Sequence, residues 1–344
     1  MNTKIIETKG LALDAKALSE AADILRDGGL VVFPTETVYG LGGDGTNADA
    51  AKKIYLAKGR PSDNPLIIHI SNPEDAESYA ITNDTYYRLA KSFMPGPLTV
   101  ILPKKDTIPL SVTGGLDSVA IRCPSHPIAR QLISATGRPI AAPSANLSGK
   151  PSPTCARHVI DDLCGRVDMI IDGGSCEIGL ESTIIKLDGD TATLLRPGAI
   201  TADGLRCVCK DVKIAPAVLE QLKENERPLS PGMKYRHYAP SVPLILVDGS
   251  DKNVTAFLKA EQTQKKCAIL CYHEEMALLE NKNIIDIGSS QDLDTQAQTL
   301  FSALRDADAL GVDIIYAHLP DKSGIGLALY NRMIRAAAHT VIKV

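Results

Sequence analysis

The sequence predicts an α/β protein with two domains, a larger one on a mixed sheet and a smaller doubly wound one. The chain has 344 residues, which exceeds the usual size of one hydrophobic core. Apolar strand-like runs alternate with amphipathic helical stretches over most of its length. A proline-rich stretch separates two such alternating regions, and this places the domain boundary there.

The first region alternates helices and strands up to about residue 200. Residues 14–29 predict a helix, because apolar residues recur at helical spacing and two glycines end the run. Further helices are expected at 46–57, 83–93, 127–137 and 156–165, and strands at 30–34, 66–70, 98–102, 118–123, 139–143 and 168–174. Strands at 182–187 and 191–196 flank "DGD" and predict a hairpin. A hairpin among helix-linked strands favours a mixed, strongly twisted sheet.

The second region follows a stretch, residues 215–243, that holds five prolines among polar residues. After it, strands are expected at 243–248, 267–272, 283–288 and 313–319, with helices at 252–265, 295–311 and 326–342. Four strands alternating with helices predict a small, doubly wound parallel domain. We therefore expect domains over residues 1–211 and 242–344, joined by a linker over 212–241.

Composition and charge narrow the class of protein. The chain carries 37 Lys and Arg against 41 Asp and Glu, a balance that argues against a dedicated nucleic-acid-binding protein. The first residues lack the apolar core of a signal peptide, and no run matches a membrane span, so a cytoplasmic protein is expected. Eight scattered cysteines form no Cys-x-x-Cys pair, which predicts neither a disulfide nor a structural metal.

The sequence contains no strong match to either of two common phosphate-binding motifs. No Walker A motif occurs, and Gly40, Gly42 and Gly45 match G-x-G-x-x-G only weakly, since "PTETVY" separates them from the preceding strand. We interpret these glycines as room for a close backbone approach, not as a dinucleotide site.

The stretch "KGRPSDNPLIIH" places cations between a helix and a strand. Arg60 and Asn64 each precede a proline, which disfavours helical backbone and predicts an extended segment. Lys58, Arg60 and Ser62 would then share one face and suit a phosphate or carboxylate. The alternative is a solvated, positively charged helix end.

Arg122 ends a strand made otherwise of apolar and small residues. A guanidinium there is costly unless it is paired, so it meets either an internal carboxylate or the carboxylate or phosphate of a ligand. Thr35 and Thr37 would share one face of an extended segment, with Glu36 opposite. Their hydroxyls either line a small polar site or are ordinary strand residues.

Polar residues also follow other predicted strands. Ser144, Asn146 and Ser152 lie in a Ser/Pro/Gly loop after a buried strand, where α/β proteins place ligands, although Ser and Asn are also common turn residues. Neither a Ser-His-Asp nor a Cys-His arrangement can be argued from spacing. The pattern favours positioning and charge neutralisation over covalent catalysis.

In this order the motifs resemble a known family. "FPTETVYGLGG", "KGRPSDNPLIIH", "PGPLTVIL", "SVAIRCPSHP", "APSANLSGKPSPT", "ESTII" and "LRPG" resemble the YrdC-like threonylcarbamoyl-adenylate synthases over about residues 10–205. "SPGMKYRHYAP" and "GIGLALYNRMIRAAA" resemble its long, two-domain branch. The resemblance implies a twisted sheet with a concave, basic cavity.

The resemblance also implies a reaction of the nucleotidyltransferase class. L-Threonine, bicarbonate and ATP, the last carried with Mg²⁺, give threonylcarbamoyl-AMP and pyrophosphate. A separate transferase would then modify the adenosine beside the anticodon of tRNA. Rival interpretations are a related carbamoyl-adenylate-forming enzyme and a double-stranded-RNA-binding or ribosome-associated module, so a weak RNA contact stays open.

Residue roles follow from the resemblance alone. It implies that Lys58 and Arg60 are catalytic and that no protein side chain binds a metal. Threonine would be bound by Thr35, His69, Arg122, Ala142 and Ser182. ATP would be bound by Lys58, Ser62, Ser118, Ser144, Asn146, Ser152, Arg196, Tyr235 and His237. His69 could equally be a satisfied core histidine. Residues 233–238 are expected to form a lid over the cavity; the alternative is a proline-stiffened spacer.

Overall fold

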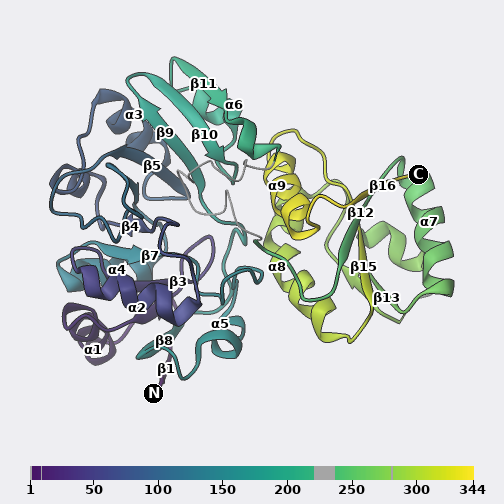
Figure 1. The fold of residues 1–344 in the computed structure, drawn as a ribbon, viewed down its shortest axis with the longest axis horizontal. Coiled ribbons are helices and arrows are strands. Elements are labelled where there is room, and N and C mark those ends of the chain that lie inside the picture. Colours follow the sequence, from purple (N-terminus) through teal and green to yellow (C-terminus); the bar gives the residue numbers. More distant parts are fainter. Residues whose placement is uncertain (1, 9, 221–236, 280–281) are drawn as a thin grey trace. The chain divides into compact units, whose positions relative to one another are not determined.

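The computed structural model describes residues 2–8, 10–220, 237–279 and 282–344 (Figure 1). The chain divides into two compact units. Unit 1 comprises Met1–Ser148, Pro153–Glu177 and Glu181–Lys234, and unit 2 comprises Gly149–Ser152, Ile178–Leu180 and Tyr235–Val344. Two short segments from the first part of the chain thus belong to unit 2.

Unit 1 is built on one mixed sheet of eleven strands in the described part of the chain, in the order β1-β8-β2-β3-β7-β4-β6-β5-β9-β10-β11. The strands are β1 (Lys4–Glu7), β2 (Val31–Phe33), β3 (Gly40–Asp44), β4 (Ile67–His69), β5 (Leu98–Pro103), β6 (Ser118–Arg122), β7 (Ile140–Ala142), β8 (Met169–Asp172), β9 (Thr183–Asp188), β10 (Thr191–Arg196) and β11 (Asp211–Ile214). The β9–β10 hairpin is antiparallel, whereas β4–β6 and β5–β9 are parallel. The predicted mixed sheet is confirmed.

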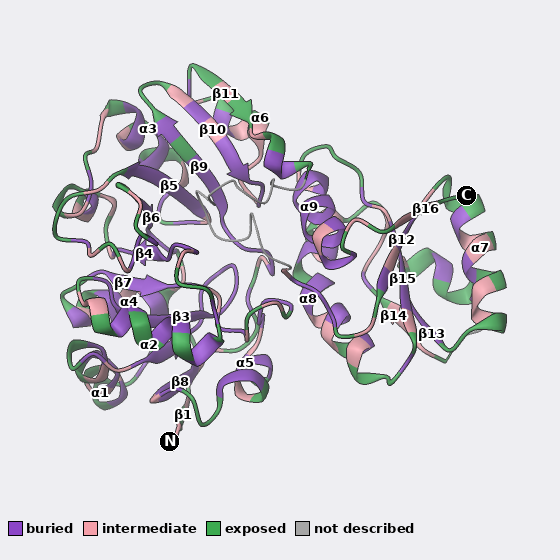
Figure 2. Cartoon of the chain, in the orientation of Figure 1, coloured by how far each residue is buried: buried purple, intermediate pink, exposed green. Residues whose placement is uncertain are grey.

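Helices cover this sheet. They are α1 (Ala15–Arg26), α2 (Ala48–Lys58), α3 (Asp84–Phe93), α4 (Pro127–Thr136), α5 (Ala156–Leu163) and α6 (Ala202–Arg206), with 3₁₀ turns η1 (Pro73–Ser78) and η2 (Pro216–Val218). Side chains cap their first turns: Asp14 accepts from the amide of Ala17, and Asn47 accepts from that of Asp49. One core cluster joins α1 and α4 to strands β2, β7 and β8, whose residues are buried in Figure 2.

The glycine-rich stretch forms β3. An added Cβ on Gly42 would lie 2.8 Å from both Ile140 and Phe33, and one on Gly45 would lie 2.9 Å from the carbonyl of Pro139. The glycines therefore allow a close backbone approach, as the sequence predicted.

Unit 2 is a five-stranded sheet, all parallel within the described residues, in the order β14-β13-β15-β12-β16. Its strands are β12 (Leu244–Asp248), β13 (Cys267–Cys271), β14 (Ile284–Asp286), β15 (Ile314–His318) and β16 (Val341–Lys343). Its helices are α7 (Asp251–Gln264), α8 (Leu293–Ala309) and α9 (Gly326–Ala336), with a 3₁₀ turn η3 (His273–Leu278). The doubly wound parallel domain is confirmed.

Four strands are absent from the sequence-based prediction. Neither β1 nor β3 was expected, β16 overlaps the end of the predicted last helix, and all of β11 except Asp211 falls inside the predicted 212–241 linker, together with η2. The last helix ends early because Ala338 and His339 have positive φ angles of 47° and 62°. The β-branched residues that follow then form β16.

None of the helices in the part of the chain that the structure describes combines the length and the hydropathy that a bilayer crossing needs.

Candidate functional site

Arg122 lies in a row of polar residues that crosses the sheet of unit 1. It is paired with His69 on β4 and with Thr99 on β5. Thr99 is in turn paired with Ile184 on β9, which is opposite Arg196 on β10. Directly opposed residues on neighbouring strands point to the same face of a sheet. The row therefore presents two cations, an imidazole and a hydroxyl on one face.

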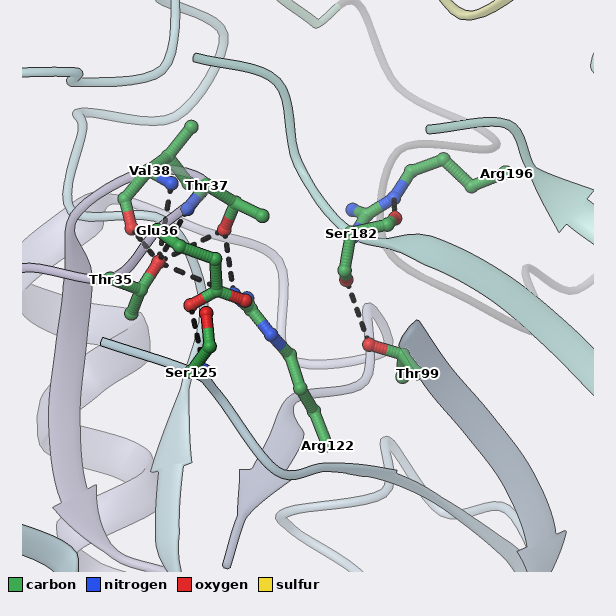
Figure 3. A network of polar contacts seen from close by, with 9 residues as sticks. All are labelled: Thr35, Glu36, Thr37, Val38, Thr99, Arg122, Ser125, Ser182 and Arg196. Atoms are coloured by element: carbon green, nitrogen blue, oxygen red, sulfur yellow. Dashed lines mark hydrogen bonds and ion pairs between the residues drawn. The ribbon is translucent and has the colours of Figure 1, made fainter. Parts of the chain in front are cut away.

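The Arg122 side chain is held by the segment 35–38 (Figure 3). Its Nη2 donates to Glu36 Oε1 at 2.6 Å, to Thr37 Oγ1 at 2.9 Å and to Thr35 Oγ1 at 3.4 Å. Arg122 and Glu36 are only 4% and 3% exposed, so this is a desolvated ion pair. Of the two alternatives for Arg122, the internal carboxylate is thus observed.

The predicted geometry of this segment was wrong. Glu36 does not lie opposite Thr35 and Thr37, because the chain bends at 36–38 instead of staying extended. Thr35 Oγ1 accepts from the amides of Thr37 and Val38, each at 3.2 Å, and donates to the Val38 carbonyl at 2.6 Å. This side-chain-to-backbone turn brings all three side chains to Arg122.

Arg122 keeps donors that no described residue uses, and one of them is buried. Its Nε is buried and has no hydrogen-bond partner within the described part of the chain. An unmade hydrogen bond from a buried group is costly, so this donor marks a position where a ligand oxygen would be stabilised.

Ser182 connects this row to Arg196. Its Oγ lies 2.7 Å from Thr99 Oγ1, and Arg196 donates to the same Oγ at 3.0 Å and to the Ser182 carbonyl at 2.9 Å (Figure 3). Arg196, expected to bind ATP, therefore contacts Ser182, expected to bind threonine. Sequence reasoning missed Thr99; its only signal was a polar residue within a buried apolar strand.

His69 is fully within the core of the sheet. Its Nδ1 lies 3.2 Å from the Ile67 carbonyl, and its ring meets Phe33 edge-on at 6.1 Å. Burial, assisted by the charge of Arg122, lowers the pKa of His69 to about 3. The imidazole is therefore neutral at physiological pH. Ala142, also expected at the threonine site, is buried in β7 opposite Ile67.

Lys58 forms a second cluster with a loop. Its Nζ donates to the carbonyl of Ser144 at 2.5 Å and to that of Asn146. Ser144 Oγ in turn donates to Asn146 Oδ1 at 2.6 Å. Lys58 is only 2% exposed, and these loop carbonyls accept hydrogen bonds from its buried ammonium group. The structure brings together three residues that the sequence assigned to ATP.

The expected row of Lys58, Arg60 and Ser62 does not form. Lys58 ends α2, Gly59 has φ +63°, and residues 61–64 turn, with the Asn64 amide donating to the Pro61 carbonyl. Glycine in this conformation ends the helix with a tight cap, which reverses the chain where extended backbone was predicted. Ser62 is left exposed.

Arg60 folds back onto its own turn. Its Nε donates to the Asn64 carbonyl at 3.3 Å and its Nη2 to the Pro65 carbonyl at 3.1 Å. These two bonds hold the guanidinium close to the start of β4, an interior strand of the sheet.

The segment 35–41 joins the two clusters. Its first part holds Arg122, as described above. Its last part bonds the loop that Lys58 holds: the Leu41 amide donates to the Pro143 carbonyl at 2.9 Å, and the Ala145 amide donates to the Tyr39 carbonyl at 2.8 Å. Seven residues of backbone thus connect the two clusters.

The remaining predicted residues lie elsewhere. Ser118 begins β6, four residues before Arg122 and on the same face, at the far end of the strand. Ser152 and His237 belong to unit 2. Tyr235 and most of the predicted lid at 233–238 lie outside the described residues. Within the described ranges, no group of three or more His, Cys, Asp and Glu is arranged to hold a metal ion.

Two models of known protein families match successive parts of the chain. A family model described as "Telomere recombination", named for Sua5, YciO and YrdC, matches residues 23–198. A second, described as "Threonylcarbamoyl-AMP synthase, C-terminal domain", matches residues 200–338.

Similar sequences and structures cover nearly the whole chain. The threonylcarbamoyl-AMP synthase of Bacillus subtilis is 44% identical over 98% of this chain and 97% of its own. That of Pyrococcus abyssi is 44% identical over 94% and 95%. The crystal structure of P. abyssi Sua5 complexed with L-threonine aligns at a TM-score of 0.91 and 41% identity, over 100% of both chains.

Proposed function

The chain belongs to the threonylcarbamoyl-AMP synthase family, and from that premise we propose how its residues make threonylcarbamoyl-AMP from L-threonine, bicarbonate and ATP. The reaction is an ATP-dependent adenylation. The observation that carries the proposal is Arg122, a buried guanidinium oriented by Glu36 and two threonine hydroxyls, with its Nε donor unused by the described residues.

Arg122 binds the carboxylate of threonine. Nη2 is committed to Glu36 and Thr37, so the carboxylate meets the donors that the described residues leave unused, the buried Nε among them. Charge-assisted hydrogen bonds in a desolvated site are stronger than those between neutral groups. Thr35, His69, Ala142 and Ser182 line the same pocket.

The desolvated surroundings of Arg122 and His69 support the first chemical step. The threonine amine must lose its proton to attack the carbon of bicarbonate, a step that forms the N–C bond and releases water. A desolvated pocket with a positive guanidinium nearby favours the neutral amine. The pKa of His69, about 3, means that the ring adds no further charge and contributes shape and polarity.

The second step joins the carbamate to the nucleotide. A carbamate oxygen attacks the α-phosphorus of ATP, and the bond to the leaving pyrophosphate breaks. This in-line displacement needs positioning and neutralisation of phosphate charge. We assign these tasks to Arg60, Arg196 and the loop of Ser144 and Asn146 that Lys58 holds. Ser62 and Ser118 complete the proposed ATP contacts within unit 1, and Mg²⁺ enters with ATP as part of that substrate.

The product is a mixed anhydride, which water hydrolyses readily. We propose that a separate tRNA threonylcarbamoyl transferase consumes it in the cytoplasm. The similarity to threonylcarbamoyl-AMP synthases supports the synthase step.

Pyrophosphate release tests the proposal. The purified chain is incubated with MgATP and bicarbonate, with L-threonine, with L-serine or with neither. We expect release that depends on L-threonine, and much less with L-serine, which lacks the methyl group. Release that is equal with and without L-threonine would show that the chain is not this synthase.

A further inference from the structure

Thr99 is a buried polar residue to which the proposed function assigns no role. It lies in β5, paired with Arg122 on β6 and with Ile184 on β9, and it is wholly buried. Ser182 lies immediately before β9 and is equally buried. Burying a hydroxyl is costly unless it forms hydrogen bonds. The hydrogen bonds of these two residues therefore determine what each hydroxyl is still able to bind.

The two hydroxyls share a short chain of hydrogen bonds (Figure 3). Thr99 Oγ1 has one partner within the described part of the chain, Ser182 Oγ at 2.7 Å. Ser182 Oγ has a second partner, because Arg196 Nη2 donates to it at 3.0 Å. A guanidinium only donates, whereas a hydroxyl has one hydrogen and two lone pairs. Arg196 therefore occupies one lone pair of Ser182 Oγ, whichever way the hydroxyl hydrogens point.

The hydroxyl hydrogens have two possible arrangements, which differ in the hydrogen that is left over. If Ser182 donates to Thr99, the hydrogen of Thr99 has no acceptor among the described residues, inside the sheet. If Thr99 donates to Ser182, both lone pairs of Ser182 Oγ are filled and only the hydrogen of Ser182 is left. A buried donor without an acceptor is costly. Only the second arrangement leaves the unused donor on the residue that the proposed function places beside the substrate.

We propose that Thr99 is a positioning residue, which donates to Ser182 and thereby makes the Ser182 hydroxyl a donor toward the substrate. The inference rests on the proposed function, in which Ser182 lines the L-threonine pocket. The group that meets Ser182 is then an acceptor oxygen of L-threonine or of its carbamate, and not an ammonium group. Arg122 and Arg196 are donors as well. This face of the sheet therefore selects the anionic end of the substrate.

A double-mutant cycle on the full chain tests the inference, with pyrophosphate release as the assay. T99V removes the Thr99 hydroxyl, T99S keeps it, and S182A removes the group through which Thr99 acts. We expect T99V to raise the KM for L-threonine about 3- to 10-fold, the effect of one neutral hydrogen bond, with a smaller change in kcat. T99S should restore a KM close to that of the wild type.

The cycle separates positioning from a general structural effect. In the S182A background, T99V should change kcat/KM by less than about 2-fold, because the two residues act as one unit. Isothermal titration with L-threonine repeats the cycle on binding alone and serves where turnover of S182A is too slow to measure.

The matched control is T136V, which makes the same change at another buried threonine. The Thr136 hydroxyl donates to the Leu132 carbonyl at 2.8 Å within α4, outside the polar row. Its KM for L-threonine should equal that of the wild type, and urea unfolding of T99V and T136V measures the loss of stability in each. An unchanged KM in T99V, an equal rise in T136V, no rescue in T99S or an undiminished effect in S182A would each overturn the inference and leave the proposed function standing. A wild type that releases no pyrophosphate in response to L-threonine would overturn both.

Discussion

At the scale of single residues, Glu36 determines how Arg122 is presented. Replacing Glu36 with Gln keeps the shape but leaves a buried guanidinium without its counter-charge. Breaking such a pair costs about 3–5 kcal/mol. We expect E36Q to lower the free energy of unfolding by about 3 kcal/mol and to raise the KM for L-threonine more than that for ATP. Urea unfolding and initial rates measure the two effects.

The exposed Asp106 provides the control, since D106N makes the same chemical change at the surface. A Glu36 variant that matches D106N in stability and in both KM values would show that the ion pair has no role in positioning.

His69 gives the protein a specific pH dependence of stability. Its pKa is about 3 in the folded chain, against an ordinary value of 6.5. Between these values the unfolded chain binds more protons, so stability falls as pH decreases through this window. Through His69 alone, we expect the protein to be about 2 kcal/mol less stable at pH 5 than at pH 7.

Urea unfolding at pH 5 and pH 7 measures this effect in the wild type and in H69Q. The variant should lose less stability on acidification. Equal losses of stability in both proteins would mean that His69 is protonated as easily in the folded chain as in the unfolded one. That result would contradict its burial.

The sequence predicted Arg122 and its two alternatives because a charged residue at the end of an apolar strand is visible without a structure. It could not predict Glu36 as the partner. Period-two spacing placed Glu36 on the opposite face, and only the hydrogen bonds of Thr35 to the backbone of residues 37 and 38 turn the chain. Thr99 was missed because cross-strand register cannot be read from one strand.

At the scale of elements, Gly59 sets the course of the cationic segment. Its φ of +63° ends α2, and a Cβ there would meet nothing within 4 Å. The cost of an alanine is therefore conformational, about 1 kcal/mol. We expect G59A to lower unfolding stability by about that amount and G59N to lower it less, since Asn tolerates this conformation.

Chemical denaturation of both variants checks the prediction. Equal stability of G59A and the wild type would mean that the helix does not end in a left-handed residue.

Most elements could be predicted from periodicity, but their ends could not. The prolines after Arg60 and Asn64 correctly indicated that the helix ends there. They are equally compatible with a turn and with an extended chain, and the structure has a turn. Likewise, the predicted final helix ran into the segment of β16, because over a few positions apolar residues fit the helical and the strand period equally well. β11 escaped notice because its residues are mostly exposed.

At the scale of the whole molecule, the shared segment 35–41 predicts coupling between the two substrates. We propose that L-threonine bound at Arg122 fixes residues 35–38, which continue into the backbone that bonds the Ser144 loop. We expect L-threonine to tighten binding of a non-hydrolysable ATP analogue about 5-fold or more, and the analogue to tighten L-threonine equally, since coupling is reciprocal.

Isothermal titration of each ligand, with and without the other, measures the coupling. Independent binding would show that the segment does not connect the sites.

The two-unit architecture was visible in the proline-rich stretch and in the alternation on either side of it. What the sequence could not show is that residues 149–152 and 178–180 group with unit 2, since such long-range contacts leave no periodic signal.

The most direct test of the account is the response of R122K to a substrate without a carboxylate. Lysine keeps the charge but loses the planar fork that Glu36 orients. The account predicts that the wild type prefers L-threonine over L-threoninol by at least 100-fold in kcat/KM. In R122K this preference should fall to less than 10-fold, and the KM for L-threonine should rise more than the KM for ATP. A preference for L-threonine that survives intact in R122K would contradict the central claim that Arg122 holds the substrate carboxylate.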